Sequence, residues 1–231
     1  MIILFWDIDG TLLTTGMAGV PAWEEAVRET TGHAFALSSI RIAGLSDFQI
    51  ALRTFELLGL EPAADRLTRL VTRYEELLQV TLPQRNGRVL PHVREILDEM
   101  HGRQDVRSYL LTGNTRGGAR AKLTHYDLWK YFPDGGFAED TGDRPSIAAR
   151  AVDLARRAGP LSEEQFFVIG DTPHDVHAAN AIGARTIAVA TGGYTRPELE
   201  SHQPWRIFEQ LPPPAEFLAL IGAHDNRGGH L

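Results

Sequence analysis

Two aspartates near the start of the chain have the types and the spacing to do chemistry. Asp7 and Asp9 follow an apolar run at residues 2–6 that has the composition of a buried strand. Because side chains along a strand alternate between its two faces, both carboxylates leave the strand on the same side. Gly10 then permits a turn without a side-chain clash. The pair suits a divalent metal and an attacking carboxylate, although an Asp-Gly pair is often only a turn.

Two further polar segments follow apolar runs in the same way. Thr112, Gly113 and Asn114 come directly after one such run, and residues 170–175 read Gly-Asp-Thr-Pro-His-Asp after another. Ligands of open parallel sheets bind beyond the carboxyl ends of the strands. A hydroxyl group, glycine amides and carboxylates are therefore expected at one edge of a sheet. This set suits a phosphoryl group with Mg²⁺, which prefers oxygen ligands.

The elements that must position these residues alternate along the second half of the chain. Apolar runs predict strands at 106–111, 166–169 and 186–189, with a weaker signal at 136–138. Helical patterns and one capped turn lie around these runs, at 91–100, 116–125, 145–157, Ser162, 175–182 and after Pro214. The alternation predicts an α/β fold, with a Rossmann-like parallel sheet and helices on both of its faces.

Residues 14–88 have a different pattern and look wholly helical. Pro21 opens one expected helix, Asp47 is a candidate cap for a second, and Pro62 begins a third with an apolar stripe at 67–78. The predicted organisation has three parts. Residues 1–14 and 88–222 form a discontinuous core, residues 15–87 form an inserted small α-helical cap, and residues 223–231 form a polar, disordered tail.

Composition narrows the class of protein. The 231 residues carry a formal net charge of −7, which argues against nucleic acid or an anionic membrane as a partner. The absence of cysteine excludes disulfides, thiolate metal sites and a cysteine nucleophile. Neither a basic leader segment nor an apolar run of about 20 residues is present. We expect a cytoplasmic protein that is a monomer or a homodimer.

The three segments together resemble the motifs of the haloacid dehalogenase (HAD) superfamily, in its phosphoglycolate phosphatase-like branch with a helical cap. The first motif, Asp-x-Asp-Gly-Thr, matches residues 7–11, and the second matches 110–114. The fourth, Gly-Asp-x-x-x-Asp, matches 170–175, and Thr-Gly at 191–192 also fits. The resemblance implies an Mg²⁺-dependent phosphoric monoester hydrolase with a small-molecule phosphate ester as its substrate.

The resemblance also implies a role for each matching carboxylate. Asp7 would attack phosphorus and form an aspartyl-phosphate, and Asp9 would act first as a general acid and then as a general base. Mg²⁺ would be held by Asp7, the backbone carbonyl of Asp9 and Asp171, with Asp175 as a further ligand or a support. Two of these residues have a structural alternative: Asp171 could cap the following helix, and Asp175 could complement the dipole of that helix.

Phosphoryl oxygens are expected to bind Thr112 and the amides near Gly113 and Asn114, although Thr112 could be an ordinary strand-end hydroxyl. The chain departs from the family at the third motif, where a lysine is usual and the sequence reads Asp-Arg-Pro. Arg144 is therefore the candidate for the cation that neutralises the phosphoryl group and orients Asp7. One alternative is Lys122, which lies mid-helix, where a solvated lysine is expected, and the other is that Arg144 has a merely structural role.

Several alternatives remain open. A dehalogenase would lack Asp9, and a phosphonate hydrolase would have a lysine within residues 14–88, where this chain has none. A sugar phosphomutase of the same superfamily would retain Asp9 and is not excluded, nor is a non-catalytic phosphate-binding or interaction module on this fold. Weaker candidates for substrate contact are Gly16, Met17, Arg41 and Ser46. The two histidines beside the predicted site, His174 and His177, are expected at the surface.

Overall fold

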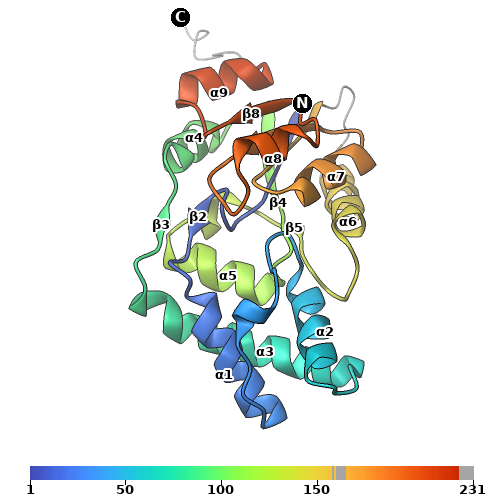
Figure 1. Ribbon diagram of the computed structural model, residues 1–231. Helices are drawn as coiled ribbons and strands as arrows, with labels where there is room; N and C mark the ends of the chain where they lie inside the picture. Colours follow the sequence, from blue (N-terminus) through green and yellow to red (C-terminus); the bar gives the residue numbers. More distant parts are fainter. Residues whose placement is uncertain (158, 160–164, 224–231) are drawn as a thin grey trace, which may run out of the picture.

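A six-stranded parallel sheet forms the centre of the part of the chain that the computed structural model describes, which is residues 1–157, 159 and 165–223. Its strand order is β5-β4-β1-β6-β7-β8 (Figure 1). The strands are β1 (Ile2–Trp6), β4 (Val106–Leu111), β5 (Gly135–Gly136), β6 (Gln165–Gly170), β7 (Arg185–Val189) and β8 (Arg206–Phe208). The predicted α/β fold with a parallel sheet is confirmed.

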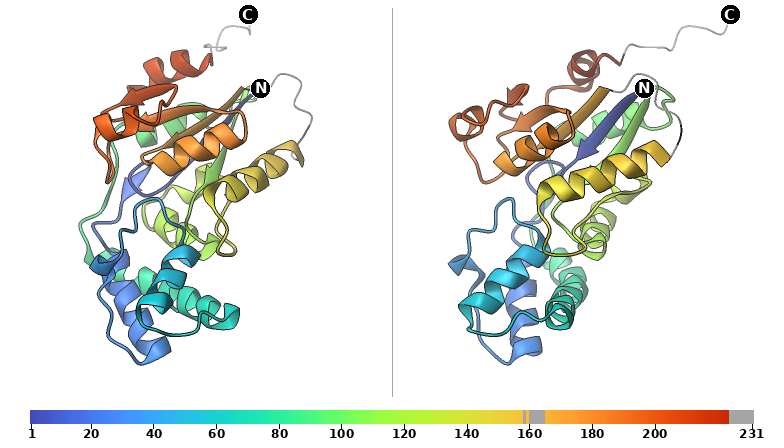
Figure 2. Two further views of the ribbon diagram at one scale, coloured as in Figure 1. Left: turned by 45° about the vertical axis from the view of Figure 1, so that its right-hand side comes forward. Right: turned by 90° about the vertical axis from the view of Figure 1, so that its right-hand side faces the viewer.

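Helices cover both faces of the sheet (Figure 2). One face carries α4 (Val93–Met100), α5 (Arg116–His125) and α9 (Pro214–Ile221), the other α6 (Arg144–Arg157) and α7 (Pro173–Ala181), and α8 (Arg196–Glu200) precedes β8. Alternate residues of β1 enter the two cores: Trp6 stacks on Phe217 on one side, and Phe5 packs with Phe166 on the other. Burial on both faces explains why β1 is a continuous apolar run.

The register of the central strands brings the predicted motifs together. Trp6 pairs with Leu110 of β4 and with Ile169 of β6. The residues that follow these three therefore leave the sheet at the same edge. The backbone N–H of Asp7 still donates to the carbonyl of Ile169, at 3.0 Å, so the first carboxylate is fixed at the strand end.

Three of the four α-helices between β1 and β4 form what we call the helical insert, which comprises α1 (Gly19–Thr31), α2 (Asp47–Leu57), α3 (Ala64–Thr81) and their connections. The insert has an apolar core of its own, in which Trp23 packs edge-on against Tyr74. It lies beyond the carboxyl ends of the strands (Figure 1), and α3 packs against α5 of the sheet domain.

The expectation that residues 14–88 are wholly helical is wrong at both ends. Thr14 and Arg88 pair in a two-stranded antiparallel ladder, formed by β2 (Leu13–Thr14) and β3 (Arg88–Val89), where the chain enters and leaves the helical insert. A ladder of two residues on each side is too short to produce an alternating pattern. The strand β8 and the helix α8 were not predicted for a similar reason, because both are too short to show a periodic pattern. Three short 3₁₀ helices complete the described elements, at Leu37–Ser39, Leu82–Gln84 and Trp129–Tyr131.

Two other boundaries differ from the expectation. The strand expected at 136–138 is Gly135–Gly136, and a Cβ on Gly136 would meet the backbone of Ile147, so the glycine lets α6 pack closely. Ala223, expected in a disordered tail, is buried. The remaining tail, 224–231, and the turn expected at Ser162 lie outside the described residues. No helix in the described part of the chain has the length and apolar character needed to cross a membrane.

Candidate active site

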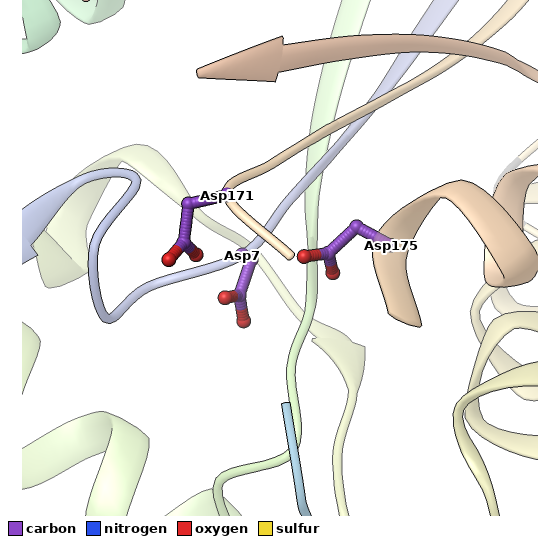
Figure 3. A group of neighbouring side chains, drawn as sticks. All are labelled: Asp7, Asp171 and Asp175. Carbon is purple, nitrogen blue, oxygen red and sulfur yellow. The ribbon is translucent and has the colours of Figure 1, made fainter. Parts of the chain in front are cut away.

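Three buried carboxylates meet at the carboxyl edge of the sheet. Asp7 follows β1, Asp171 follows β6, and Asp175 lies in the first turn of α7. One oxygen of each lies within 4.8 Å of the others, and Figure 3 shows the three side chains next to one another. The structure thus brings together three of the four aspartates predicted as metal ligands. The carboxylate of Asp9, for which only the backbone carbonyl was predicted as a ligand, is not part of this cluster.

Arg144, the first residue of α6, is the cation of this cluster. Its Nη2 lies 3.2 Å from Oδ1 of Asp7 and 3.4 Å from Oδ1 of Asp175. Its Nη1 donates to the carbonyl of Leu111, at 3.2 Å. Burial alone would lower the pKa of this guanidinium, but the charges of Asp7 and Asp175 outweigh that effect, so the pKa is raised above its usual value. The residue predicted to replace the usual lysine of the family therefore lies against the predicted nucleophile.

The cluster holds more negative charge than Arg144 neutralises. Burial raises the pKa of Asp7 to about 6 despite the opposing effect of Arg144, and burial with the neighbouring Asp7 raises the pKa of Asp171 well above its usual range. In addition, Oδ1 of Asp175 is buried and accepts no hydrogen bond from any described residue. Excess buried carboxylate and an unsatisfied oxygen fit a divalent cation with oxygen ligands.

The structural alternatives for Asp171 and Asp175 have different outcomes. Thr172, not Asp171, is the N-cap residue of α7. Asp175 does belong to the helix terminus, because its Oδ2 accepts from the backbone N–H and the hydroxyl of Thr172, at 3.1 and 2.8 Å. Only its Oδ1 is left for a ligand, so the capping role and a metal-binding role are compatible.

Two glycines make room for the carboxylate of Asp171. A Cβ at either Gly10 or Gly192 would overlap that side chain, and Gly10 also has a φ of +82°, which favours glycine. The hydroxyl of Thr11 donates to Oδ1 of Asp171, at 3.3 Å. The Asp-Gly-Thr segment and the Thr-Gly pair at 191–192 thus share one task, which is to seat this carboxylate.

Asp9 is held apart from the cluster by a second cation. Nζ of Lys122 lies 2.6 Å from Oδ2 of Asp9 and 2.5 Å from Oδ1 of Asn114, and Nδ2 of Asn114 donates to the same Oδ2 of Asp9 at 2.8 Å. Burial opposes the charge on Lys122, but Asp9 and its neighbours raise the pKa of the ammonium group. The expectation of a solvated lysine is wrong, because only 7% of this side chain is exposed.

A signal for the burial of Lys122 is present in the sequence. Residue 122 lies three positions after Ala119 and adjacent to Leu123, on the buried stripe of α5. A lysine on such a stripe needs an acidic partner, since an unpaired buried ammonium is costly. The identity of that partner could not be read locally, because Asp9 lies 113 residues away in sequence.

The second motif forms a small polar network. The hydroxyl oxygen of Thr112 accepts from Nδ2 of Asn114, at 2.8 Å, so Asn114 links Thr112 to Asp9. Gly113 serves a close approach, because a Cβ there would meet the backbone of Leu45 in the helical insert. Three of the four predicted phosphate-binding residues, Thr112, Gly113 and Asn114, therefore lie where the core meets the insert.

Asp47 docks the helical insert onto the core. The cap of α2 is Ser46, which forms a capping box with Gln49, so the expectation that Asp47 caps this helix is wrong. The Asp47 carboxylate instead accepts from the backbone N–H of Thr115, at 2.8 Å, and its own N–H donates to the carbonyl of Gly113, at 2.8 Å. A carboxylate at the N-terminus of α5 also interacts favourably with the dipole of that helix.

A cavity of about 480 Å³ separates the core from the helical insert. Its core side includes seven of the eight predicted site residues, namely Asp7, Asp9, Thr112, Gly113, Asn114, Arg144 and Asp171. Asp175 lies behind them and does not line the cavity. Of the weaker candidates for substrate contact, Met17 lines it, whereas Gly16, Arg41 and Ser46 do not. His177 is exposed as expected, and His174 is half-buried.

This fold and site define a member of a known family. The model of the haloacid dehalogenase-like hydrolase family matches residues 4–180, so the chain belongs to that family and is a hydrolase.

Individual relatives agree with this assignment. The protein named "Probable phosphatase IndB" from Dickeya dadantii is 28% identical over 222 residues, which cover 96% of this chain and 92% of that protein. Two solved structures share the fold. A hydrolase from Pseudomonas syringae has a TM-score of 0.70 and 22% identity, covering 96% of this chain and 98% of its own. A predicted phosphoglycolate phosphatase from Haemophilus somnus has a TM-score of 0.69 and 16% identity, covering 94% and 96%.

Proposed function

We propose that this protein is an Mg²⁺-dependent phosphatase that hydrolyses a small organic phosphomonoester through an aspartyl-phosphate on Asp7. The observation that carries the proposal is the division of the carboxylates into two groups. Asp7 lies in a buried cluster with Arg144, whereas Asp9 lies apart, held by Lys122 and Asn114 on the same cavity. A nucleophile and a separate acid–base group are what transfer from an oxygen leaving group requires.

In the first step, a carboxylate oxygen of Asp7 attacks phosphorus and the bond from phosphorus to the ester oxygen breaks. Asp9 gives a proton to that departing oxygen, and the alcohol leaves. Both bonds that hold Asp9 use its Oδ2, and 43% of the side chain is exposed. Its Oδ1 is therefore the oxygen that we assign to proton exchange with the substrate.

In the second step, Asp9 takes a proton from a water molecule, whose oxygen attacks phosphorus. The bond from phosphorus to Asp7 breaks, which restores the carboxylate and releases inorganic phosphate. The sum of the steps is an ester and water converted to an alcohol and phosphate. Asp9 ends each cycle protonated and ready to act as the acid again.

We assign phosphoryl binding to Thr112, Gly113, Asn114 and Arg144. The Nε of Arg144 is buried and donates to no described residue, which leaves one guanidinium donor for an anionic ligand. A planar guanidinium suits phosphoryl oxygens because it offers donors in a fixed fork. Arg144 would thus contact the phosphoryl group and keep Asp7 oriented toward it.

Mg²⁺ would be held by Asp7, Asp171 and Asp175, with the backbone carbonyl of Asp9. The ion would supply positive charge where a carboxylate and an anionic phosphoryl group must approach one another. The cluster needs that charge, because one guanidinium faces three buried carboxylates. Since burial raises the pKa of Asp7 to about 6, protons would compete with the cation below that pH.

The helical insert would act as a cap, with boundaries at residues 15–87. Its hydrogen bonds with Thr115, which the carboxylates of Asp47 and Glu75 accept, join the insert to the core. Closure would exclude water until the phosphoryl group has been transferred, and opening would release the alcohol.

The alternatives fit the site less well. A dehalogenase needs no acid for a halide, which would leave the Asp9, Lys122 and Asn114 group without a task. A sugar phosphomutase must bind a second phosphate, yet Lys122 and Arg144, the lysine and arginine among the lining residues, are both paired with carboxylates. The name of the Dickeya dadantii relative, a probable phosphatase, also supports the proposal.

The proposal predicts that the purified protein releases phosphate from p-nitrophenyl phosphate when Mg²⁺ is supplied. EDTA is expected to reduce the rate to background, and excess Mg²⁺ to restore it, because the carboxylate cluster would lose and regain its counter-charge. Release of p-nitrophenolate and of inorganic phosphate should be measured together.

Three outcomes would contradict this proposal in different ways. No turnover of any member of a phosphomonoester panel would favour a binding module. Activity that survives EDTA would remove the metal from the account. Transfer of the phosphoryl group to a second position of a sugar phosphate, without release of phosphate, would identify a mutase.

A further inference from the structure

We propose that the cavity selects a phosphomonoester whose leaving group is uncharged and has an aromatic or other apolar body. This inference rests on the proposed function, because it concerns the part of the substrate that departs from the same site. It arises from the contrast between the two walls of the cavity. The core supplies most of the ionisable groups of the cavity, whereas the helical insert supplies a mostly apolar surface that includes one carboxylate, Asp47.

The apolar wall combines buried side chains with side chains that are exposed to solvent. It is lined by Met17, Val20, Trp23, Leu37, Ile42 and Ile50. Such a wall stabilises a bound group roughly in proportion to the apolar surface that the group removes from water. It gives little stabilisation to a polyhydroxylated chain, whose hydroxyl groups would lose water without gaining partners.

The mouth carries apolar side chains that folding leaves in water. Within the described part of the chain, large hydrophobic residues are exposed at four positions, Met17, Ile42, Leu57 and Val80, and the first two line this cavity. Met17 is 70% exposed and Ile42 is 38% exposed. Exposed apolar groups that gather at one cavity mark a binding site, and methionine adapts to varied apolar shapes.

The backbone at Met17 supports a role in binding. Its φ is +63°, a conformation that is uncommon for residues other than glycine. Strained positions of this kind cluster at functional sites, where the surrounding structure holds them in place. Glycine would adopt this backbone conformation more easily, but it would not place a long apolar side chain at the mouth of the cavity.

The charges of the cavity exclude a second anionic group on the substrate. No lysine or arginine of the insert, as the structure describes it, lines the cavity. The one charged group that the insert contributes to the lining is the carboxylate of Asp47. Lys122 and Arg144, on the core side, are bound to Asp9 and Asp7. Arg41 stacks on the ring of Tyr194 and is not part of the lining. A carboxylate or second phosphate near the insert would therefore be buried beside Asp47 without a partner.

The volume sets an upper limit on this leaving group. A cavity of about 480 Å³ must hold both the phosphoryl group and the departing alcohol. This lies in the range of about 300–1,000 Å³ that is typical of small-molecule sites. A single ring on a short linker fits such a space, and Thr15 and Tyr74 offer hydroxyl groups for one or two polar substituents.

The test compares three esters: benzyl phosphate, 4-carboxybenzyl phosphate and glycerol phosphate. The methylene group between ring and ester oxygen keeps the leaving-group basicity of the first two nearly equal, so their difference reports binding of the carboxylate. We expect kcat/KM for benzyl phosphate to exceed that for each of the others by about tenfold or more.

A charge introduced at the mouth should change that preference. Ile42→Lys is expected to raise kcat/KM for 4-carboxybenzyl phosphate several-fold and to lower it for benzyl phosphate. Leu57→Lys is the matched control, because Leu57 is also an exposed hydrophobic residue of the insert but does not line the cavity. This control should leave the order of the three esters unchanged.

The outcomes separate this inference from the function on which it rests. Turnover in which the carboxylated ester or glycerol phosphate equals or exceeds benzyl phosphate would overturn the inference and leave the phosphatase intact. The same holds if Ile42→Lys and Leu57→Lys change the preference equally. No turnover of any of the three esters would overturn the inference alone if p-nitrophenyl phosphate is hydrolysed, and would overturn the proposed function as well if it is not.

Discussion

Asp7→Asn is expected to lower kcat/KM for p-nitrophenyl phosphate by about 10³-fold or more. The amide has nearly the same shape as the carboxylate, so the cluster with Arg144 can keep its packing. It is a poor nucleophile, however, and cannot form the acyl phosphate on which the proposed reaction depends. Steady-state kinetics with saturating Mg²⁺ measure the effect. A variant that retains a tenth of the activity would show that Asp7 is not the nucleophile.

The same variant should be more stable than the unmodified protein when metal is removed. The pKa of Asp7 is raised to about 6 in the folded protein, above its usual value of 3.8. Folding therefore loses stability as the pH rises from about 4 through 6, since the buried carboxylate must ionise. We expect Tm in EDTA to be higher for Asp7→Asn than for the unmodified protein at pH 8, and the difference to shrink at pH 5. Asp65→Asn, a change at an exposed carboxylate of α3, should show neither effect.

Lys122→Met is expected to lower kcat/KM by about 10²-fold, within the range that general acid–base groups contribute. Lys122 fixes Asp9 through a contact of 2.6 Å and supports Asn114, which donates to the same oxygen. Methionine preserves much of the buried volume but removes the charge, so Asp9 loses both its position and its counter-ion. Lys130→Met is the matched control, because Lys130 is the other lysine of the chain and lies on the surface, paired with Asp127.

The dependence on leaving group distinguishes this role from a merely structural one. An alkyl phosphate needs its departing oxygen protonated, whereas p-nitrophenolate leaves readily as an anion. Lys122→Met should therefore lose more activity with benzyl phosphate than with p-nitrophenyl phosphate. Equal losses with both esters, with a lowered Tm, would reduce Lys122 to a packing residue. Unchanged kinetics would remove it from the site.

The parts of the fold that local patterns control were predictable. Trp6 and Phe5 face opposite sides of the sheet, so β1 is apolar throughout, and the polar residues that follow it mark the carboxyl edge. Parallel pairing then places Asp7 and Asp171 at the same edge without any further information. Arg144 was predicted from the resemblance to the third motif of the family, which points to the start of the helix that follows β5.

The parts that depend on long-range contacts were not predictable. Asp9 and Lys122 are far apart in sequence, and a lysine on a mid-helix position has no local sign of its partner. Asp47 is of a residue type that often caps helices, yet its carboxylate accepts a hydrogen bond from the backbone N–H of Thr115, 68 residues away. The apolar wall of the cavity is likewise invisible, because Ile42 and Met17 cannot be distinguished from core residues until their exposure is known.

The most direct test of the account is to trap the phosphoryl group on Asp7. The Asp9→Asn variant, mixed with radiolabelled p-nitrophenyl phosphate and Mg²⁺ and then quenched in acid, should accumulate the intermediate. The first step needs no proton for p-nitrophenolate, but the second loses the base that activates water. We expect a hydroxylamine-sensitive label on the N-terminal peptide that contains Asp7, and none when Asp7→Asn is added to the variant. A label on another residue, or phosphate release at an unchanged rate when Asp7 is absent, would contradict it.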